Sequence, residues 1–272
     1  MTDIYKFCNK LVCGCGIESM KQLPDACIPL TVTSPPFDDL RLFGGHSFHF
    51  EPMARELWRV TAEGGVVCWH VQEQIKNGSE TGTSSEQRLY FRDLGFRLHH
   101  TMVVETVAGH VSSDVRYGSA LQYLFVLSKG KPRTFNPIKD VPNKLDGQRT
   151  GFRQRHSDGS TRNRRQVVIG PTRMRGVVWQ LYPGSHNSDD REALAHPALM
   201  HEGLARDLIR SWSRPGELVL DLMGGAASTA VAALEEGRHF LSFEVFPEYH
   251  ELAVARLEKT WERMKQKVKV AS

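Results

Sequence analysis

The stretch that decides the fold is ELVLDLMGGAASTAVAALEEGRHFLSFEV, residues 217–245. An apolar run ends at Asp221, small residues follow at 224–228, an alanine-rich segment predicts a helix over 226–236, and a second apolar run ends at Glu244. This order predicts a β-α-β unit, whose two strands run parallel. Because ligands bind beyond the carboxyl ends of parallel strands, we expect Asp221 and Glu244 to face one pocket.

The acid and the loop of this unit favour a nucleoside as the ligand. Glu244 is placed to accept hydrogen bonds from two ribose hydroxyls. A dinucleotide site favours G-x-G-x-x-G to hold the pyrophosphate, whereas residues 224–229 read GGAAST. A sulfonium nucleoside carries no phosphate and does not need those glycines. A dinucleotide site, or two solvated acids without a ligand, are the alternatives that the pattern leaves open.

The rest of the chain alternates short apolar runs with amphipathic stretches, which predicts an α/β fold with a mostly parallel sheet covered on both faces. We expect strands at 28–33, 66–71, 98–106, 120–127, 218–221 and 239–244. We expect helices at 51–60, 84–94, 198–212 and 226–236, and a last one that includes 249–261. The pair Gly64-Gly65 is expected to break the chain before the strand at 66–71, and residues 76–84 to form a polar loop.

Composition restricts the class of protein. Of 272 residues, 40% are hydrophobic and 24% are charged, which is typical of a globular protein. There is no run of about 18 apolar residues, and the start MTDIYKFCNK lacks the apolar core of a secretion signal. The five cysteines show no paired spacing. We therefore expect a reduced, cytoplasmic chain with neither a membrane span nor a metal site.

The positive charge is concentrated in residues 131–180. This window holds twelve Lys and Arg against three Asp, a balance of +9, while the whole chain carries only +4. It also holds four prolines and little periodicity, so we expect a loop-rich insertion that divides one domain into halves at 1–130 and 181–272. A basic face on an acidic body predicts nucleic-acid binding, with a solvated basic loop as the alternative.

The segment Thr33-Ser34-Pro35-Pro36-Phe37 follows a predicted buried strand. Consecutive prolines make the turn rigid and remove two amide donors. The Ser34 hydroxyl and the Pro35 carbonyl can then each accept one N–H bond from an amino group, and Phe37 can stack on the ring that carries it. This arrangement predicts a receptor for the amine of a flipped-out base, with a purely structural turn as the alternative.

Three motifs in this order resemble the permuted β-class of DNA amino-methyltransferases. They are TSPPF at 33–37, HPA at 196–198, and LDLMGGAAST at 220–229 followed by the acid at Glu244. The resemblance implies a Rossmann-like methyltransferase sheet in circularly permuted order, with an inserted target-recognition region. It also implies S-adenosylmethionine as the cofactor, double-stranded DNA as the substrate and a homodimer. Whether a cognate restriction nuclease is a partner stays open.

The resemblance assigns roles to individual residues. The catalytic turn comprises Ser34, Pro35, Pro36 and Phe37. The cofactor set comprises Thr33, His196, Pro197, Ala198, Asp221, Gly225, Ala227, Ser228, Thr229 and Glu244. In the predicted target-recognition region, we expect DNA contacts from Arg149, Arg153, Arg155, Arg162, Arg164, Arg165, Arg173 and Arg175. A serine at position 34 favours cytosine N4 over adenine N6, and both bases stay open.

The chain also departs from the family pattern. Leu222 stands where the family has proline, and Ala226-Ala227 replace Ser-Gly, so an inactive DNA-binding relative is one alternative. An RNA or protein amino-methyltransferase is another, although most of those place the cofactor motif before the catalytic turn. A metal hydrolase would have to use His46, His49, His70, His99, His100 and His110. These histidines show no H-E-x-x-H spacing, so we interpret them as scattered.

Overall fold

The computed structural model describes residues 4–37, 48–106, 115, 117, 121–151, 153–163, 166–182, 187–188 and 190–271. The described chain falls into two compact units. The larger unit comprises residues 1–136 and 177–272, and the smaller one residues 137–176. None of the helices in the described ranges is long and apolar enough to cross a membrane.

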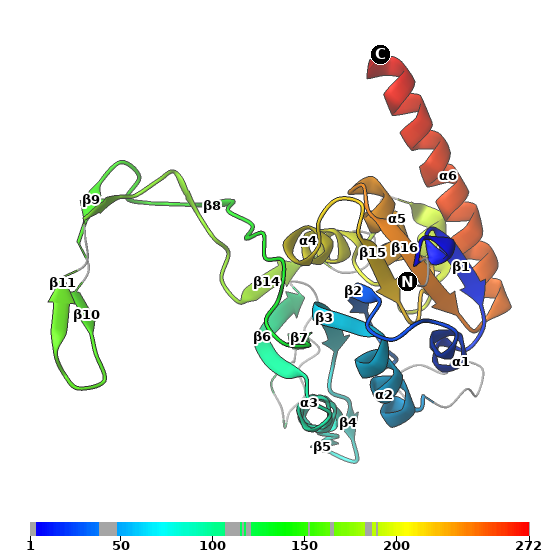
Figure 1. The fold of residues 1–272 in the computed structure, drawn as a ribbon, viewed down its shortest axis with the longest axis horizontal. Coiled ribbons are helices and arrows are strands. Elements are labelled where there is room, and N and C mark those ends of the chain that lie inside the picture. Colours follow the sequence, from blue (N-terminus) through cyan, green and yellow to red (C-terminus); the bar gives the residue numbers. More distant parts are fainter. Residues whose placement is uncertain are drawn as a thin grey trace. The chain divides into compact units, whose positions relative to one another are not determined.

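The larger unit is built on an eight-stranded sheet with the order β1-β16-β15-β2-β3-β7-β6-β14 (Figure 1). All neighbouring strands are parallel except β7, which runs antiparallel to both β3 and β6. The strand bounds are β1 Lys10–Cys13, β2 Ile28–Thr33, β3 Thr61–Val71, β6 Arg97–Thr106, β7 Leu121–Ser128, β14 Val178–Leu181, β15 Leu218–Asp221 and β16 His239–Glu244. The predicted mainly parallel α/β fold is confirmed.

Three helices cover each face of this sheet. On one face lie α1 (Gly16–Lys21), α2 (Phe50–Val60) and α3 (Thr83–Asp93), which pack with the buried Trp69 and Val67 of β3. On the other lie α4 (Glu202–Trp212), α5 (Ser228–Glu235) and α6 (Pro247–Ala271). Among the described residues, the remaining short elements of this unit are the 3-10 turns η1 (Ile4–Phe7) and η3 (Arg191–Ala195) and the hairpin of β4 (Ile75–Lys76) and β5 (Ser79–Glu80). Burial on both faces explains why the central strands β2, β15 and β16 are mostly apolar.

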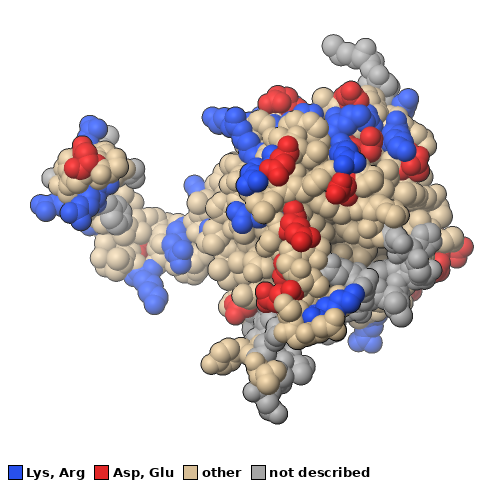
Figure 2. All heavy atoms as spheres, turned by 90° about the horizontal axis from the view of Figure 1, so that it is seen from below, with Lys and Arg blue, Asp and Glu red and all other residues tan. Residues whose placement is uncertain are grey.

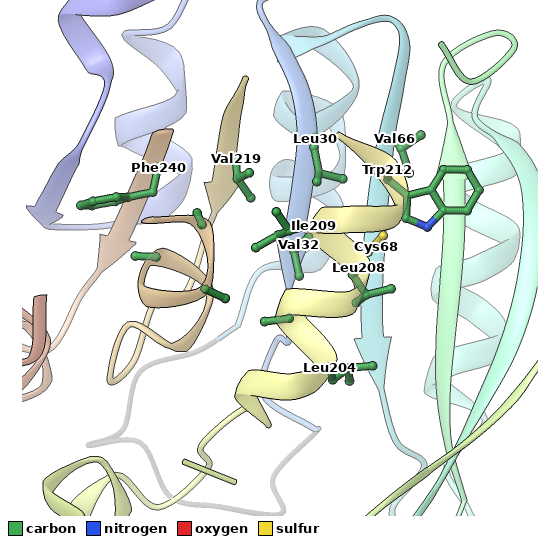
Figure 3. Close-up of a cluster of buried hydrophobic side chains, with 14 of the residues drawn as sticks. Leu30, Val32, Val66, Cys68, Leu204, Leu208, Ile209, Trp212, Val219 and Phe240 are labelled. Carbon is green, nitrogen blue, oxygen red and sulfur yellow. The ribbon is translucent and has the colours of Figure 1, made fainter. Parts of the chain in front are cut away.

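The core under α4 shows how the central strands are held. Leu204, Leu208 and Trp212 recur at a spacing of four and so share one face of the helix. In Figure 3 this face lies against the side chains of Leu30 and Val32 from β2. Burial of such side chains stabilises each contact by about 1.5–3 kcal/mol. The packing fixes the strand that leads directly into the Ser-Pro-Pro turn.

Two of the predicted element boundaries are wrong. The helix expected from residue 198 begins only at Glu202, because His201 is its N-cap and accepts the amide of Gly203 at 3.0 Å through Nδ1. The break expected at Gly64-Gly65 lies inside β3 instead. There Gly64 has φ +72, and the pairing with β2 skips from Thr61 to Val66. The glycines therefore form a strand irregularity rather than a strand end.

Two strands of the sheet were not expected from the sequence. Strand β1 pairs with β16, from Lys10 opposite Leu241 to Cys13 opposite Glu244. Strand β14 pairs with β6, beginning at Val178 opposite Val103, and so forms the last strand of the sheet. Residues 178–180 of this strand belong to the basic window 131–180. The smaller unit holds only residues 137–176 of that window, so the strand lies in the larger unit.

The smaller unit, residues 137–176, is called the ribbon unit below. It consists of three successive antiparallel strand pairs (Figure 1). They are β8 (Val141–Pro142) with β13 (Thr172–Arg173), β9 (Arg149–Thr150) with β12 (Val167–Val168), and β10 (Arg153–Arg155) with β11 (Thr161–Asn163). The end turn is closed by Gly159 at φ +84 and by Asp158, whose carboxylate accepts the Ser160 amide at 2.8 Å. Where a loop-rich module was predicted, the chain runs out and back as a two-stranded ribbon.

Candidate active site

The Ser-Pro-Pro turn and the predicted cofactor segment meet at the middle of the sheet. Strand β15 pairs in parallel with β2, with Val219 opposite Leu30. At the carboxyl ends of these strands, the Thr33 hydroxyl donates to Asp221 Oδ1 at 2.8 Å across 188 residues of sequence. Both residues are buried. A hydrogen bond between buried groups fixes the relative position of the two segments.

A cavity of about 680 Å³ opens beyond these strand ends. Its wall brings together most of the residues predicted from the sequence, namely Ser34, Pro35, Pro36, Phe37, His196, Pro197, Ala198, Asp221, Gly225, Ser228 and Glu244. All of them belong to the larger unit. The volume is in the range of small-molecule and cofactor sites.

Three residues of the predicted cofactor set are buried and do not line the cavity. Thr33 bonds to Asp221, as described above. Thr229 is 1% exposed, and its hydroxyl lies 3.5 Å from the Val32 carbonyl. Ala227 is fully buried and caps α5 with φ +63, a left-handed conformation that favours glycine. The methyl group that departs from the family glycine therefore points into the core cluster.

Glu244 is a buried carboxylate held by the backbone of the cofactor loop. Oε2 accepts the amide of Gly225 at 2.7 Å, and Oε1 accepts the amide of Phe246 at 2.9 Å. Burial raises the pKa of Glu244, and the two amides act against that shift. Each carboxylate oxygen has a second lone pair, so both remain able to accept a hydroxyl from a ligand in the cavity.

Asp221 is more deeply enclosed than Glu244. Burial raises its pKa, while hydrogen bonds from Thr33, Thr229 and the Met223 amide oppose the shift. Its Oδ1 accepts both Thr33 and the Met223 amide, the latter at 3.2 Å. Asp221 therefore orders the start of the glycine loop as well as lining the cavity.

The cofactor loop has no space for a side chain at Gly225. A Cβ at Gly225, where φ is +51, would lie 2.9 Å from His196 Nε2. The His196 ring in turn packs on Tyr249 with ring centroids 4.4 Å apart, and its Nδ1 accepts the Ala198 amide at 3.1 Å. The segment at 196–198 therefore packs directly on the loop.

Sequence reasoning missed two groups of cavity residues. The first follows β1 and comprises Gly14, Cys15 and Gly16. A Cβ at Gly16 would lie 2.7 Å from the Leu222 carbonyl, so this turn packs directly on the cofactor loop. Alternating small residues in CGCG after the apolar KLV were the available signal. The second group comprises His70 and Gln122, which come from neighbouring strands β3 and β7.

His70 lies beside the catalytic turn and is only 6% exposed. Its Nδ1 is 3.4 Å from Ser34 Oγ, and its carbonyl oxygen is 3.2 Å from the same hydroxyl. The ring meets Phe37 edge-on, with centroids 5.9 Å apart. Burial lowers the pKa of His70 to about 4, an effect that a hydrogen bond with Gln122 partly offsets. The imidazole is therefore neutral at physiological pH.

The burial of His70 predicts an acid-dependent loss of stability. Because its pKa falls from 6.5 unfolded to about 4 folded, its contribution is complete above pH 6.5 and lost as the pH falls toward 4. Between about pH 7 and pH 4.5, wild type should lose about 2–3 kcal/mol more unfolding free energy than His70→Gln. Urea denaturation at both pH values measures this difference. Asp221 and Glu244 titrate in both proteins and cancel, so equal losses would contradict the prediction.

The histidines do not form a metal centre in the part of the chain that the structure describes. No three His, Cys, Asp or Glu side chains there are grouped so that they could hold a metal ion. His49 and His70 line the cavity. His99 instead packs edge-on against Trp212, which belongs to the core on the face covered by α4, whereas Trp69 belongs to the core on the opposite face. His46 and His110 lie outside the described residues.

The predicted DNA-binding arginines lie in the ribbon unit. Five of them are exposed, namely Arg149, Arg153, Arg155, Arg162 and Arg173. Arg175 is half-buried and pairs with Asp140, with Nε 2.9 Å from Oδ1. Arg164 and Arg165 lie outside the described residues. Figure 2 shows Lys and Arg side chains (blue) on this unit, which holds ten of them against three Asp.

Comparison with known proteins places these features in a family. Residues 28–255 match the sequence model of the N6_N4_Mtase family, whose description is DNA methylase. The chain belongs to this family. The orphan methyltransferase M.BamHII of Bacillus amyloliquefaciens is 40% identical to this methylase over 242 residues, which cover 88% of the chain and 91% of the relative.

Solved structures with a similar fold include a DNA methyltransferase. The cytosine-N4-specific PvuII DNA methyltransferase matches this methylase with a TM-score of 0.66 and 18% identity, over 93% of the chain and 90% of the other. The SAM complex of M1.HpyAVI matches with a TM-score of 0.62 and 15% identity, over 91% and 98%. At these identities the likeness establishes the fold, which is that of DNA methyltransferases.

Proposed function

We propose that this DNA methylase transfers a methyl group from S-adenosylmethionine to the exocyclic amine of a flipped-out base, with cytosine N4 favoured by Ser34. The observation that carries the proposal is the Thr33–Asp221 hydrogen bond. It joins the strand ends so that Ser34 and Glu244 line one cavity. An amine held at one end and a nucleoside at the other would then lie within reach of each other.

The residues of the cavity fit S-adenosylmethionine. Glu244 offers buried acceptors for two ribose hydroxyls, and Gly225 leaves the loop free of side chains. Ser228 Oγ lines the cavity, is buried, and has no hydrogen-bond partner within the described residues. Such a group is costly unless a ligand satisfies it. When bound, the cofactor supplies a methyl group on a positively charged sulfur. The family and the SAM complex among its structural relatives agree with this cofactor.

The catalytic turn provides two acceptors, and its two prolines provide no backbone amide donor. The nitrogen of a base amine is a poor nucleophile because its lone pair is conjugated into the ring. Ser34 Oγ and the Pro35 carbonyl would each accept one of its N–H bonds and draw it toward tetrahedral geometry. Pro35 and Pro36 have no amide hydrogens that could occupy the same acceptors. Phe37 lines the same cavity and would stack on the base.

The ribbon unit supplies the contacts to DNA in this proposal. A two-stranded β-ribbon is narrow enough to enter the major groove. In the pair β10–β11, Arg153 and Arg155 alternate with Gln154 and so share one face of the ribbon. Their exposed guanidinium groups match phosphate and guanine acceptors. The same proposal treats residues 1–130 and 181–272 as two halves of one methyltransferase domain, divided by this target-recognition region.

Removal of two ribbon arginines should weaken DNA binding and leave the cofactor site intact. We expect Arg153→Ala with Arg155→Ala to lower duplex affinity by about ten-fold at about 150 mM salt and to reduce the salt slope by about two. Fluorescence anisotropy over a salt series measures both values. The matched control is Lys21→Ala with Lys265→Ala, which removes two exposed charges from helices of the larger unit. Equal effects of the two double variants would contradict a specific role for the ribbon.

The direct test is incubation of the purified chain with labelled S-adenosylmethionine and duplex DNA, followed by nucleoside analysis. N4-methylcytosine is the expected product. N6-methyladenine would assign the other base covered by the family name. DNA binding without any methyl transfer would favour the inactive relative, and transfer only to RNA or protein would replace the DNA substrate. Modification-sensitive sequencing of DNA from expressing cells then gives the recognition site.

The two partners considered from the sequence, a second copy of the chain and a cognate nuclease, differ in their support. Homodimerisation remains a prediction, which sedimentation of the purified chain would test. The similar M.BamHII is named an orphan methyltransferase, so the comparison gives no support for a cognate nuclease, and the proposal includes none.

A further inference from the structure

We propose that His70 is a positioning residue for the methyl-transfer reaction: its Nδ1 accepts the hydroxyl proton of Ser34, so that the Ser34 oxygen lone pairs face the base amine. This inference rests on the proposed function and extends it to a residue on a different strand. Ser34 directly follows β2 and His70 lies near the end of β3, where the register places Thr33 opposite Trp69.

The geometry restricts what the Ser34 hydroxyl can do. Its two neighbouring acceptors both belong to His70, the carbonyl oxygen at 3.2 Å and Nδ1 at 3.4 Å. A hydroxyl has one proton and two lone pairs. When the proton points to His70, both lone pairs are directed away from it and are free for a ligand in the cavity that Ser34 lines. A hydroxyl left to rotate would present its proton to the amine for part of the time and would repel it.

The environment keeps the imidazole in the form that can accept. His70 is 6% exposed, and burial keeps the ring neutral, so one nitrogen carries no proton. The ring is further held by the edge-on contact with Phe37. Nε2 has no hydrogen-bond partner of good geometry within the described residues, although Gln122 lies near the ring. A buried and incompletely paired imidazole on the wall of a cavity is expensive for the fold, which calls for a functional reason.

The experiment separates the two ring nitrogens. Asparagine carries its polar atoms on the γ carbon and can replace Nδ1, whereas glutamine carries them one carbon further and can replace Nε2. We expect His70→Asn to keep kcat for DNA methylation within about five-fold of wild type, and His70→Gln to lower it by about 30-fold or more. Cofactor affinity, measured by calorimetry, and the melting temperature should be similar for the two variants, so that folding does not explain the difference.

A Ser34→Ala background tests whether His70 acts through Ser34. Residues that act as one unit are non-additive. We therefore expect His70→Gln to lower kcat by less than about three-fold when Ser34 is already alanine. A full additional loss would overturn the proposal, and so would higher activity of His70→Gln than His70→Asn, which would place the functional atom at Nε2. Wild-type kcat in both variants would show that the His70 carbonyl suffices, and would also overturn it.

A spectroscopic readout keeps this test apart from the proposed function. If the wild-type chain methylates no DNA, the proposed function fails. The contact itself is then decided by the imidazole ¹⁵N shifts of His70, because a nitrogen that accepts a hydrogen bond shifts when the donor is removed. We expect Nδ1 to shift between wild type and Ser34→Ala while Nε2 does not. No change at Nδ1 would overturn the proposal whatever the activity of the chain.

Discussion

Replacing Ser34 with alanine is expected to lower kcat for DNA methylation by about 10²–10³-fold, while affinity for S-adenosylmethionine stays within about two-fold of wild type. Ser34 lines the catalytic side of the cavity and makes no hydrogen bond with the cofactor loop. Its loss removes one of two acceptors for the base amine, an interaction that strengthens as the nitrogen becomes tetrahedral. Such a change therefore lowers kcat rather than cofactor binding.

Single-turnover transfer of a labelled methyl group to a saturating duplex measures the kcat effect, and calorimetry measures cofactor affinity. The matched control is Ser79→Ala, which removes an exposed hydroxyl from β5 and should retain wild-type kcat. A Ser34→Ala variant with wild-type kcat would show that the Pro35 carbonyl alone holds the amine. A parallel loss of cofactor affinity would mean that the turn supports the fold of the site rather than the chemistry.

The site residues that the sequence predicted are those whose positions follow from the residues next to them in the chain. Asp221 and Glu244 each end an apolar run, so their positions at strand ends follow from the pattern alone. Ser34 to Phe37 form a turn whose prolines restrict the backbone whatever the surroundings. In the structure all of these residues line one cavity.

The part that was missed depends on which strands are neighbours. His70 lies in an apolar run and resembles any other histidine of the chain. Only the register of β3 against β2 places it beside Ser34. Likewise, β1 has only four residues, two of them half-buried and two exposed, which is too short for a periodic signal. It becomes a strand by pairing with β16. Tertiary pairing therefore decides features that local propensity leaves undetermined.

The misplaced helix start shows the same limit at shorter range. Residues 198–201 read ALMH, and the first three continue the apolar spacing of α4. In the structure, His196 Nδ1 accepts the Ala198 amide and His201 Nδ1 accepts the Gly203 amide. Two successive side-chain caps thus replace helical hydrogen bonds, and histidine is not among the residues usually expected at this position. The result is a cavity-lining segment where a longer helix was predicted.

Replacing Glu244 with alanine is expected to reverse the pattern of Ser34→Ala, with affinity for S-adenosylmethionine falling by about 10²–10⁴-fold. Hydrogen bonds to a carboxylate contribute about 1.5–3 kcal/mol each, and the ribose hydroxyls would lose both of theirs. The change also leaves the Gly225 and Phe246 amides without their acceptor. Calorimetry with the cofactor and with its demethylated product measures the affinity, and DNA binding by the ribbon unit should persist.

Two further variants separate loss of the ribose contact from collapse of the loop. Glu244→Gln keeps one acceptor oxygen in the same volume, so its affinity should lie between those of wild type and Glu244→Ala. Glu18→Ala removes an exposed glutamate from α1 and should bind the cofactor as wild type does. If Glu244→Ala retained full affinity at an unchanged melting temperature, the buried acid would serve only to cap the Gly225 and Phe246 amides. The cofactor would then have to be held by other residues of the cavity, among them the turn at Gly16, which packs on the same loop.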